Sequence, residues 1–140
     1  MDEYEYPTLD DVIRVNQDLF GLDAPNPFRR AEKHQLEAPS QIILALKLMR
    51  EESRSGWYKA AVLLKALCKR PFASGNKRTA FLMAYAFLIQ NGLYQESTAN
   101  PVIDEPDRNT SVLVGTRQGY YTVDDLAEWY ETGKIKPRTN

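Results

Sequence analysis

The chain of 140 residues is long enough to bury the core of one domain of ordinary size, and two domains are not expected. Its composition, with 43% hydrophobic and 26% charged residues, excludes disordered and fibrous proteins and indicates a globular one. The formal net charge of −1 gives no overall attraction to nucleic acid or to anionic membranes, so neither is an expected partner. We therefore expect a single domain over residues 1–140.

The sequence carries no recognisable targeting or membrane signal. Its first residues, MDEYEYPTLDD, are acidic and lack the basic and then apolar regions of a signal peptide. No apolar run approaches the roughly 20 residues of a membrane span. The single cysteine, Cys68, cannot form an internal disulfide and lies in an apolar run, where a buried thiol is expected. These features predict a cytoplasmic protein.

The first helix is marked at both ends. Thr8 and Asp11 have the spacing of a capping box, and Gly21 follows as a stop, so a helix is expected over residues 9–20. After a proline-broken loop, the sequence RRAEKHQLEA, residues 29–38, is expected to form a short second helix. The core face of the first helix would carry Leu9, Val12, Ile13 and Phe20.

The middle of the chain predicts three more helices. One begins at Pro39, and a turn with the sequence SRSGWY, residues 53–58, separates it from a helix over residues 59–69. The last of the three, residues 77–91, is apolar on nearly every side and is closed by Gly92, which is typical of a helix at the centre of a molecule. The apolar residues that recur at helical spacing in the first of the three are Ile42, Ile43, Leu46 and Met49.

The C-terminal third reads as a loop followed by one clear helix. Residues 97–109 contain two prolines, and a short TSVLVG segment comes next. Thr122 and Asp125 then form a second capping box, so a helix is expected from there to Gly133, with Trp129 and Tyr130 sealing it against the core. No strand is strong enough to build a sheet. The expected fold is all-α, a single-domain bundle of about six helices around one hydrophobic central helix.

The stretch KRPFASGNKRTA, residues 69–80, has the pattern of a phosphate-binding loop that runs into a helix. Gly75 and Asn76 directly precede the helix, where backbone N–H groups are unpaired and the helix dipole favours anions. Gly75 would let the backbone approach a phosphate closely, and the Asn76 amide can donate a hydrogen bond. The cations around this helix N-terminus are Lys69, Arg70, Lys77 and Arg78. The alternative is an ordinary turn surrounded by solvated cations.

The same stretch resembles the motif of the Fic and Doc (death-on-curing) family, most closely of its short Doc-like branch. That motif reads His-Pro-Phe, two residues of which the second is acidic, and then Gly-Asn-Lys-Arg-Thr-Ala opening an apolar helix. The chain resembles it over residues 70–80. The sequences YPTLDDVIRVNQDLFG, FLMAYAFLIQNGL and VGTRQGYYTVDDLAEW are similar to the family's opening helix, its helix after the motif and its closing segment. The resemblance thus covers nearly the whole chain.

The resemblance implies a small helical protein that binds ATP or another nucleoside triphosphate with magnesium and modifies a hydroxyl of a target protein. Fic members usually transfer the nucleoside monophosphate, whereas the Doc-like branch transfers a phosphate. By position, Phe72 would anchor the loop in the core. The residues that would hold the phosphates are Gly75, Asn76, Lys77 and Arg78. The residues that would form a flap, which aligns a target peptide by strand-like pairing, are Ser53, Arg54, Ser55, Gly56, Trp57 and Tyr58.

Two positions depart from the family pattern, and both concern chemistry. Arg70 stands where the family has a His that takes the proton from the attacking hydroxyl, and a guanidinium cannot do so because it stays charged. Ser74 stands where the family has an acidic magnesium ligand, and a neutral hydroxyl is a weaker ligand for this cation. Loss of a general base alone typically lowers the rate by ~10²–10⁴. The only histidine, His34, is expected to be a surface or packing residue.

The sequence therefore predicts a Doc-like, toxin-family protein with a phosphate- or nucleotide-binding loop and a degenerate catalytic motif, which acts by binding or is inactive. One alternative is an active transferase that moves a phosphate or a nucleotide from ATP to a protein hydroxyl with another base. A second is a helical structural or nucleic-acid-binding module. The resemblance also implies an antitoxin partner that fills the active-site groove and a target protein of the translation machinery.

Overall fold

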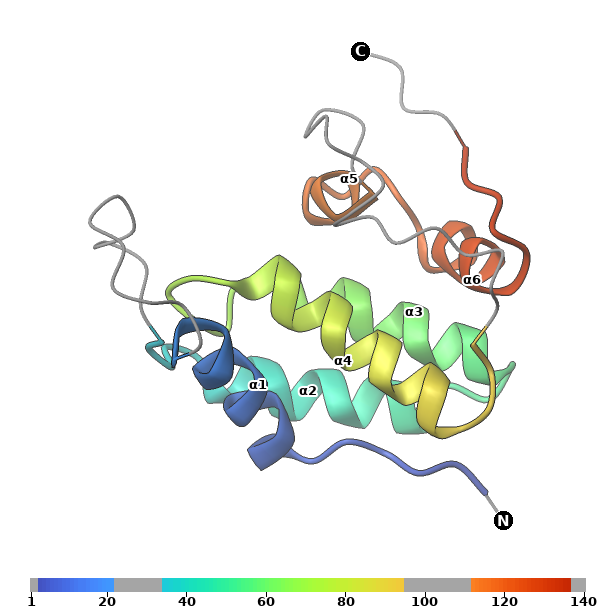
Figure 1. Ribbon diagram of the computed structural model, residues 1–140. Helices are drawn as coiled ribbons and strands as arrows, with labels where there is room; N and C mark the ends of the chain where they lie inside the picture. Colours follow the sequence, from blue (N-terminus) through green and yellow to red (C-terminus); the bar gives the residue numbers. More distant parts are fainter. Residues whose placement is uncertain (1–2, 22–33, 95–111, 137–140) are drawn as a thin grey trace.

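The computed structural model describes residues 3–21, 34–94 and 112–136 of the chain. These three stretches contain no β-strand, only one isolated antiparallel bridge between Leu36 and Phe72. The expected all-α fold is therefore confirmed. The helices in these stretches are α1 (Leu9–Gly21), α2 (Pro39–Glu51), α3 (Gly56–Leu67), α4 (Asn76–Gln90), α5 (Val112–Arg117) and α6 (Val123–Thr132), shown in Figure 1.

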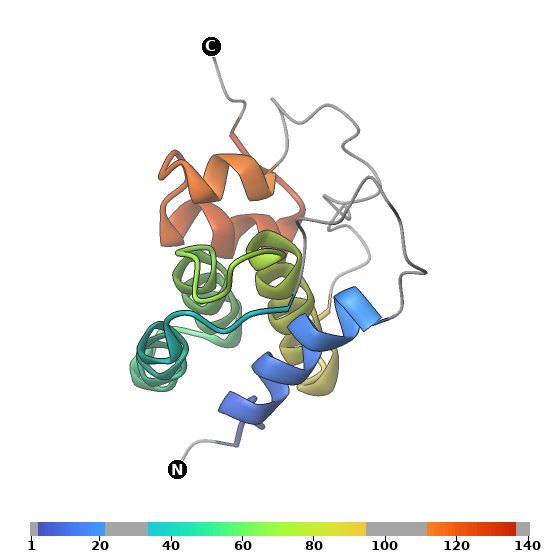
Figure 2. The same cartoon turned by 90° about the vertical axis from the view of Figure 1, so that its left-hand side faces the viewer.

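The helices pack around two neighbours, α3 and α4. Helix α3 contacts α2, α4 and α6, whereas α4 contacts α1, α3 and α5. Figure 2 shows α5 and α6 together on one side of α3 and α4, with α1 and α2 on the other. The predicted central helix, α4, thus shares the centre with α3. It also keeps one open side, where Leu82 and Ile89 are 38% and 50% exposed.

The core is built from the faces that these helices turn toward one another. Its largest fully buried side chains include Trp129 and Tyr130 of α6, as the sequence predicts. Val12 is buried, and Leu9 and Ile13 pack against the core from its edge. The predicted apolar face of α2 is right for Ile42, Leu46 and Met49 but wrong for Ile43, which is 55% exposed.

Both predicted capping boxes are present. Asp11 accepts a hydrogen bond from the Thr8 backbone N–H at 2.9 Å, and the Thr8 hydroxyl accepts one from the Asp11 N–H at 3.2 Å. Thr122 and Asp125 make the same pair of bonds at the start of α6. These bonds pair backbone N–H groups that the first helical turn leaves without a partner.

Two predicted helix assignments are wrong. Residues 34–38 of the expected second helix are extended and lie beside the motif loop, while residues 29–33 fall outside the described part. Helix α3 begins at Gly56 rather than residue 59, because the Ser55 hydroxyl caps it by accepting a bond from the Tyr58 N–H at 3.3 Å. The predicted turn over residues 53–58 therefore supplies the first turn of α3.

The N-terminal segment that precedes α1 is fastened to the C-terminal end of α4. The Asn91 side chain accepts a hydrogen bond from the Glu5 N–H at 2.7 Å and donates one to the Glu5 carbonyl at 2.9 Å. The rings of Tyr4 and Tyr6 each lie 5.9 Å from the ring of Phe87. One amide side chain and one aromatic cluster thus join the start of the chain to α4.

Candidate functional site

The motif loop connects the C-terminus of α3 to the N-terminus of α4. Cys68 caps the end of α3 and is buried, and this burial raises the pKa of its thiol to about 12. At pH 7 the thiol is therefore protonated and unreactive, as expected for a packing residue. Gly75 is the N-cap of α4 and has a left-handed backbone with φ of 74°.

Asn76 closes the loop with its side chain. Its Oδ1 accepts a hydrogen bond from the Phe72 N–H, and its Nδ2 donates one to the Phe72 carbonyl, both at 2.9 Å. The side chain is 4% exposed. Because the amide is buried and bonded to the loop backbone, its role in the structure is to hold the loop in shape. The predicted contact between Asn76 and a phosphate stays a prediction.

Phe72 lies in the core and is fully buried, the position expected of a loop anchor. Residues 34–38 run beside this part of the loop. The Ala73 N–H donates to the Gln35 carbonyl at 2.9 Å, and the Pro71 carbonyl accepts bonds from two N–H groups of that segment at the same distance. The ring of His34 lies 5.8 Å from the ring of Phe72. The motif loop is therefore supported by a segment that lies far from it in the sequence.

Asn16 of α1 connects this segment to the start of α4. It is fully buried, and its Nδ2 donates hydrogen bonds to the Ser74 carbonyl at 2.9 Å and to the Thr79 hydroxyl at 3.0 Å. Its Oδ1 lies 2.8 Å from Nδ1 of His34. Ser74 and Thr79 stand on either side of Gly75. A single side chain thus fixes the junction between the loop and α4 and holds His34 against it.

Gly75 is required for two reasons that the structure makes explicit. Its φ of 74° lies in the left-handed region, which L-residues with a side chain rarely adopt. A Cβ atom at this position would lie 3.1 Å from both Asn16 Nδ2 and the Phe20 ring. Because α1 lies so close, a side chain here would fit only if the Asn16 or Phe20 side chain shifted by a few tenths of an ångström.

Four cations lie in the motif loop and in the first turn of α4. Lys69 and Arg70 are exposed, while Lys77 and Arg78 are half-buried. The guanidinium of Arg78 lies 5.8 Å from the centre of the Phe20 ring. Within the described stretches, Lys69 and Arg70 make no ion pair. Because Gly75 has no side chain with which to cap the helix, the helix N-terminus and these cations favour an anion.

Arg70 has an unusual backbone as well as an unusual identity. Its φ is 63°, and it is the one residue other than glycine with a positive φ in the described part of the chain. A non-glycine residue held in this region costs of order 1–2 kcal/mol, which the surrounding loop must offset. The guanidinium has five N–H donors and no lone pair, so it can hold a phosphate but cannot accept a proton.

The residues near the loop do not fit a magnesium ion held by protein carboxylates. Ser74 is half-buried, and its carbonyl already accepts the bond from Asn16. Within the described residues there is no group of three or more His, Cys, Asp or Glu side chains that could hold a metal ion. Magnesium prefers carboxylate oxygens, which this part of the loop lacks.

The predicted flap, residues 53–58, lies at the wrong end of α3 to flank the loop. The loop follows the C-terminus of α3, whereas Ser55 caps its N-terminus. The 12 residues of α3 span about 18 Å at the rise of an α-helix. The prediction placed the flap by its position in the sequence, which ignored the length of the helix in between. The segment that does lie beside the loop is residues 34–38.

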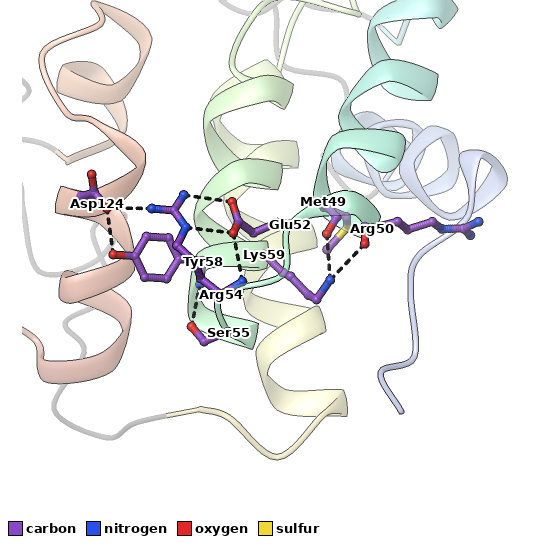
Figure 3. Close-up of polar contacts among 8 residues, drawn as sticks. All are labelled: Met49, Arg50, Glu52, Arg54, Ser55, Tyr58, Lys59 and Asp124. Carbon is purple, nitrogen blue, oxygen red and sulfur yellow. Dashed lines mark hydrogen bonds and ion pairs between the residues drawn. The ribbon is translucent and has the colours of Figure 1, made fainter. Parts of the chain in front are cut away.

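The residues at that far end of α3 form a charged cluster, drawn in Figure 3. Arg54 donates from Nε to Glu52 at 2.9 Å and from a terminal nitrogen to Asp124 at 3.0 Å. The Tyr58 hydroxyl donates a hydrogen bond to Asp124 at 2.8 Å. The Arg54 guanidinium lies 3.8 Å from the centre of the Tyr58 ring. The hydrogen bond from Arg54 lowers the pKa of Glu52 to about 2. This cluster ties α6 to the start of α3.

The remaining residues of this end also serve packing. Trp57 donates from Nε1 to the Leu93 carbonyl at 3.0 Å. Lys59 is 4% exposed and donates from Nζ to the carbonyls of Met49 and Arg50 at 3.1 and 3.2 Å, at the C-terminus of α2 (Figure 3). The side chains of Trp57 and Tyr58 are thus both engaged in contacts within the fold.

The residues around the loop that the sequence did not assign to the site are Asn16 and His34. The sequence contained one indication of a role for Asn16, because it is a polar residue on the otherwise apolar face of α1, one helical turn after Val12. His34 gave none, since its neighbours in the sequence favour a helix that does not form. Both reach the loop only through the tertiary fold.

A model of the Fic/DOC family matches residues 6–88, which is more than half of the chain and includes the whole loop. Among curated proteins, no relative matches the chain significantly. No helix in the described stretches is both long and apolar enough to span a membrane.

Proposed function

Since the chain belongs to the Fic/DOC family, we propose that it is a Doc-like protein whose loop binds the phosphates of a nucleoside triphosphate but whose residue 70 does not promote their transfer. The observation that carries the proposal is the arrangement at the N-terminus of α4. A left-handed Gly75 begins the helix without a capping side chain, and cations flank it on both sides. Such an arrangement favours a polyanion over a neutral ligand.

Arg70 supports binding rather than transfer. In the family the residue at this position accepts a proton, which Arg70 cannot do because its guanidinium has no lone pair. The same guanidinium can bind phosphate oxygens through two parallel hydrogen bonds. Replacement of the base by Arg70 would therefore strengthen phosphate binding while it lowers the rate of transfer. We also propose that an antitoxin-like partner chain and a target in the translation machinery remain the relevant protein partners.

The test measures ATP binding and transfer in matched variants. We expect ATP to raise the melting temperature of the unaltered chain, and the double variant Lys77→Ala, Arg78→Ala to lose most of this rise. The variant Arg54→Ala serves as a control, because it removes a cation at the other end of α3. The same chains are then incubated with labelled ATP and cell extract.

The transfer assay separates binding from catalysis. We expect no labelled protein with the unaltered chain, and labelling with the variant that combines Arg70→His and Ser74→Asp. Labelling by the unaltered chain at a rate near that of the repaired variant would establish the alternative, an active transferase with a different base. Absence of any ATP effect on the melting temperature would refute the binding proposal itself.

A further inference from the structure

The outward side of α2 is apolar where a surface helix usually carries polar groups. Figure 2 shows α2, drawn in teal, at the edge of the bundle. Exposed residues recur at helical spacing on one side of it, which we call the α2 face: Ser40, Ile43, Leu44, Lys47, Leu48 and Glu51. We propose that two copies of the chain associate through this face, with their α2 helices antiparallel. The proposal is independent of the proposed function, because the α2 face contains no residue of the motif loop.

The apolar residues of the α2 face are open to solvent. Ile43, Leu44 and Leu48 are 55%, 50% and 41% exposed. The exposed positions of α6, by contrast, include the acidic residues Asp124 and Glu128, as is usual for a helix that faces water. A group of adjacent large apolar side chains on the surface favours contact with another protein surface.

The exposed side of α4 is apolar too, but it carries nothing that identifies a partner. Leu82 and Ile89 are 38% and 50% exposed. The exposed residues of α4, over Asn76–Gln90, have no acidic or basic side chain. The α2 face combines its apolar residues with one basic and one acidic side chain, and the positions of these two charges restrict what can pack on it.

The charges of α2 suit a second α2 helix that runs in the opposite direction. At its N-terminus, Ala38 makes no side-chain capping bond, and the first turn of Pro39–Glu51 has no acidic residue. Glu51 lies in the last turn, where the dipole of its own helix disfavours a negative charge. Its ion pair with Lys47, at 3.9 Å, joins two exposed side chains and stabilises little.

Antiparallel pairing resolves both features at once. Glu51 of each copy then lies at the N-terminus of the partner's α2, where the dipole favours a carboxylate. A two-fold axis that crosses the helix between residues 45 and 46 also brings Ile43 opposite Leu48 of the partner subunit, and Leu44 opposite the carbon chain of Lys47 of the partner subunit. Every position of the α2 face thus meets another position of the same face, as a two-fold symmetric contact requires.

The surface beside α2 extends the apolar contact. A hollow of about 490 Å³ on the side of α1 is lined by residues that include Leu9 and Ile43. A second hollow, of about 380 Å³, lies on the other side of α2 and is lined by residues that include Leu48, Val62 and Val123. Side chains of a second copy can therefore bury apolar surface on both sides of the helix pair as well as along it.

Sedimentation equilibrium of the unaltered chain is the first test. We expect the mass to rise from the 16.0 kDa of one chain toward twice that value as the concentration increases through the micromolar range. Glu51→Gln should weaken the dimer roughly threefold to thirtyfold, because two contacts between a carboxylate and a helix N-terminus are lost. Added salt should weaken the unaltered dimer more than the dimer of this variant.

A charge exchange tests the antiparallel arrangement. Ile43→Glu and Leu48→Lys should each weaken the dimer by about tenfold or more, because each leaves a charge unpaired in an apolar contact. The double variant should recover most of the lost affinity, since the new glutamate of each copy meets the new lysine of the other. Residues 43 and 48 are five positions apart, so these charges do not pair within one helix. An equal mixture of the two single variants should likewise form a mixed dimer.

The control is Ile89→Lys, which places a charge on the exposed side of α4 at a position as open as those of the α2 face. It should leave the dimer unchanged. All the substituted side chains are exposed, so circular dichroism should show each variant folded.

The opposite results would overturn the proposal. A mass that stays at 16.0 kDa up to millimolar concentration would assign the α2 face to a partner of another kind. A dimer that Ile89→Lys weakens but the α2 variants do not would move the interface to α4. Single variants that weaken the dimer without recovery in the double variant or in the mixture would rule out the antiparallel arrangement.

Discussion

The two ends of α3 organise their polar groups in opposite ways. At the C-terminal end, neutral amides of Asn76 and Asn16 hold the motif loop through buried hydrogen bonds to backbone and hydroxyl groups. At the N-terminal end, charges do the corresponding work, because the exposed Arg54 pairs with the half-buried Glu52 and the exposed Asp124. Both ends carry cations, but the amide hydrogen bonds that hold the loop involve none of them.

This difference bears on where a ligand can bind. Arg54 already has two carboxylate partners, so an anion that approached it would have to displace them. Lys69 and Arg70 make no ion pair with the residues that the structure describes, and no hydrogen bond that shapes the loop depends on their charge. The two ends therefore differ in whether their cations already form ion pairs with carboxylates. Cations that do form a structural cluster, and cations that do not are candidates for binding an anion.

The largest expected effect comes from removing the amide that closes the loop. We expect Asn76→Ala to lower the free energy of unfolding by about 2–4 kcal/mol, because it leaves the buried Phe72 N–H and carbonyl without partners. Chemical denaturation measures this change. The control Gln90→Ala, on the exposed side of α4, should stay within about 0.5 kcal/mol of the unaltered chain. If Asn76→Ala also lowered the free energy of unfolding by no more than about 0.5 kcal/mol, the structural role of the amide would be contradicted.

A smaller effect is expected where α1 closes over the loop. Gly75→Ala should lower the free energy of unfolding by about 1–3 kcal/mol, from the left-handed backbone and from the contacts of the new Cβ with Asn16 and Phe20. Gly92→Ala is the matched control, since Gly92 has a similar φ of 69° but no atom of the described residues within 4 Å of the place that its Cβ would take. The difference between the two variants measures the close approach alone. Equal losses would mean that α1 yields readily at this point.

The smallest expected effect is an acid dependence confined to the charged end. Because the pKa of Glu52 is lowered from 4.5 to about 2, its ionised form stabilises the fold above pH 4.5, and this contribution is lost as the pH falls toward 2. We expect denaturation midpoints of the unaltered chain to fall more steeply across this range than those of Glu52→Gln. Parallel curves would show that the pairing with Arg54 adds nothing to stability.

The sequence predicted well whatever depends on near neighbours. The capping boxes at Thr8 and Thr122 could be found because each joins residues three positions apart. The cations and Gly75 of the loop were equally visible, since the motif that resembles the family is continuous. The left-handed backbone of Gly75 is one that glycine adopts readily, whereas nothing in the sequence indicated the positive φ of Arg70.

The missed start of α3 is a local error, because the Ser55 cap bonds to Tyr58 three residues on. The other helix error arose where distant segments meet. Residues 34–38 contain good helix formers, but their backbone pairs with the loop at Phe72 and Ala73 instead. The flap was misplaced for a related reason, because order along the chain does not show which end of α3 a segment occupies. Asn16 was visible as a polar residue on an apolar face, whereas its partners, including His34, follow only from the packing of α1 against α4.

The two hydrogen bonds between Asn91 and Glu5 can form only after both residues have been synthesised. The two residues are 86 positions apart, so the ribosome releases the N-terminal segment long before the amide that holds it has been made. Closing so long a chain segment carries an entropic cost and slows folding. The segment around Glu5 can therefore take its place only after α4 and Asn91 have been synthesised.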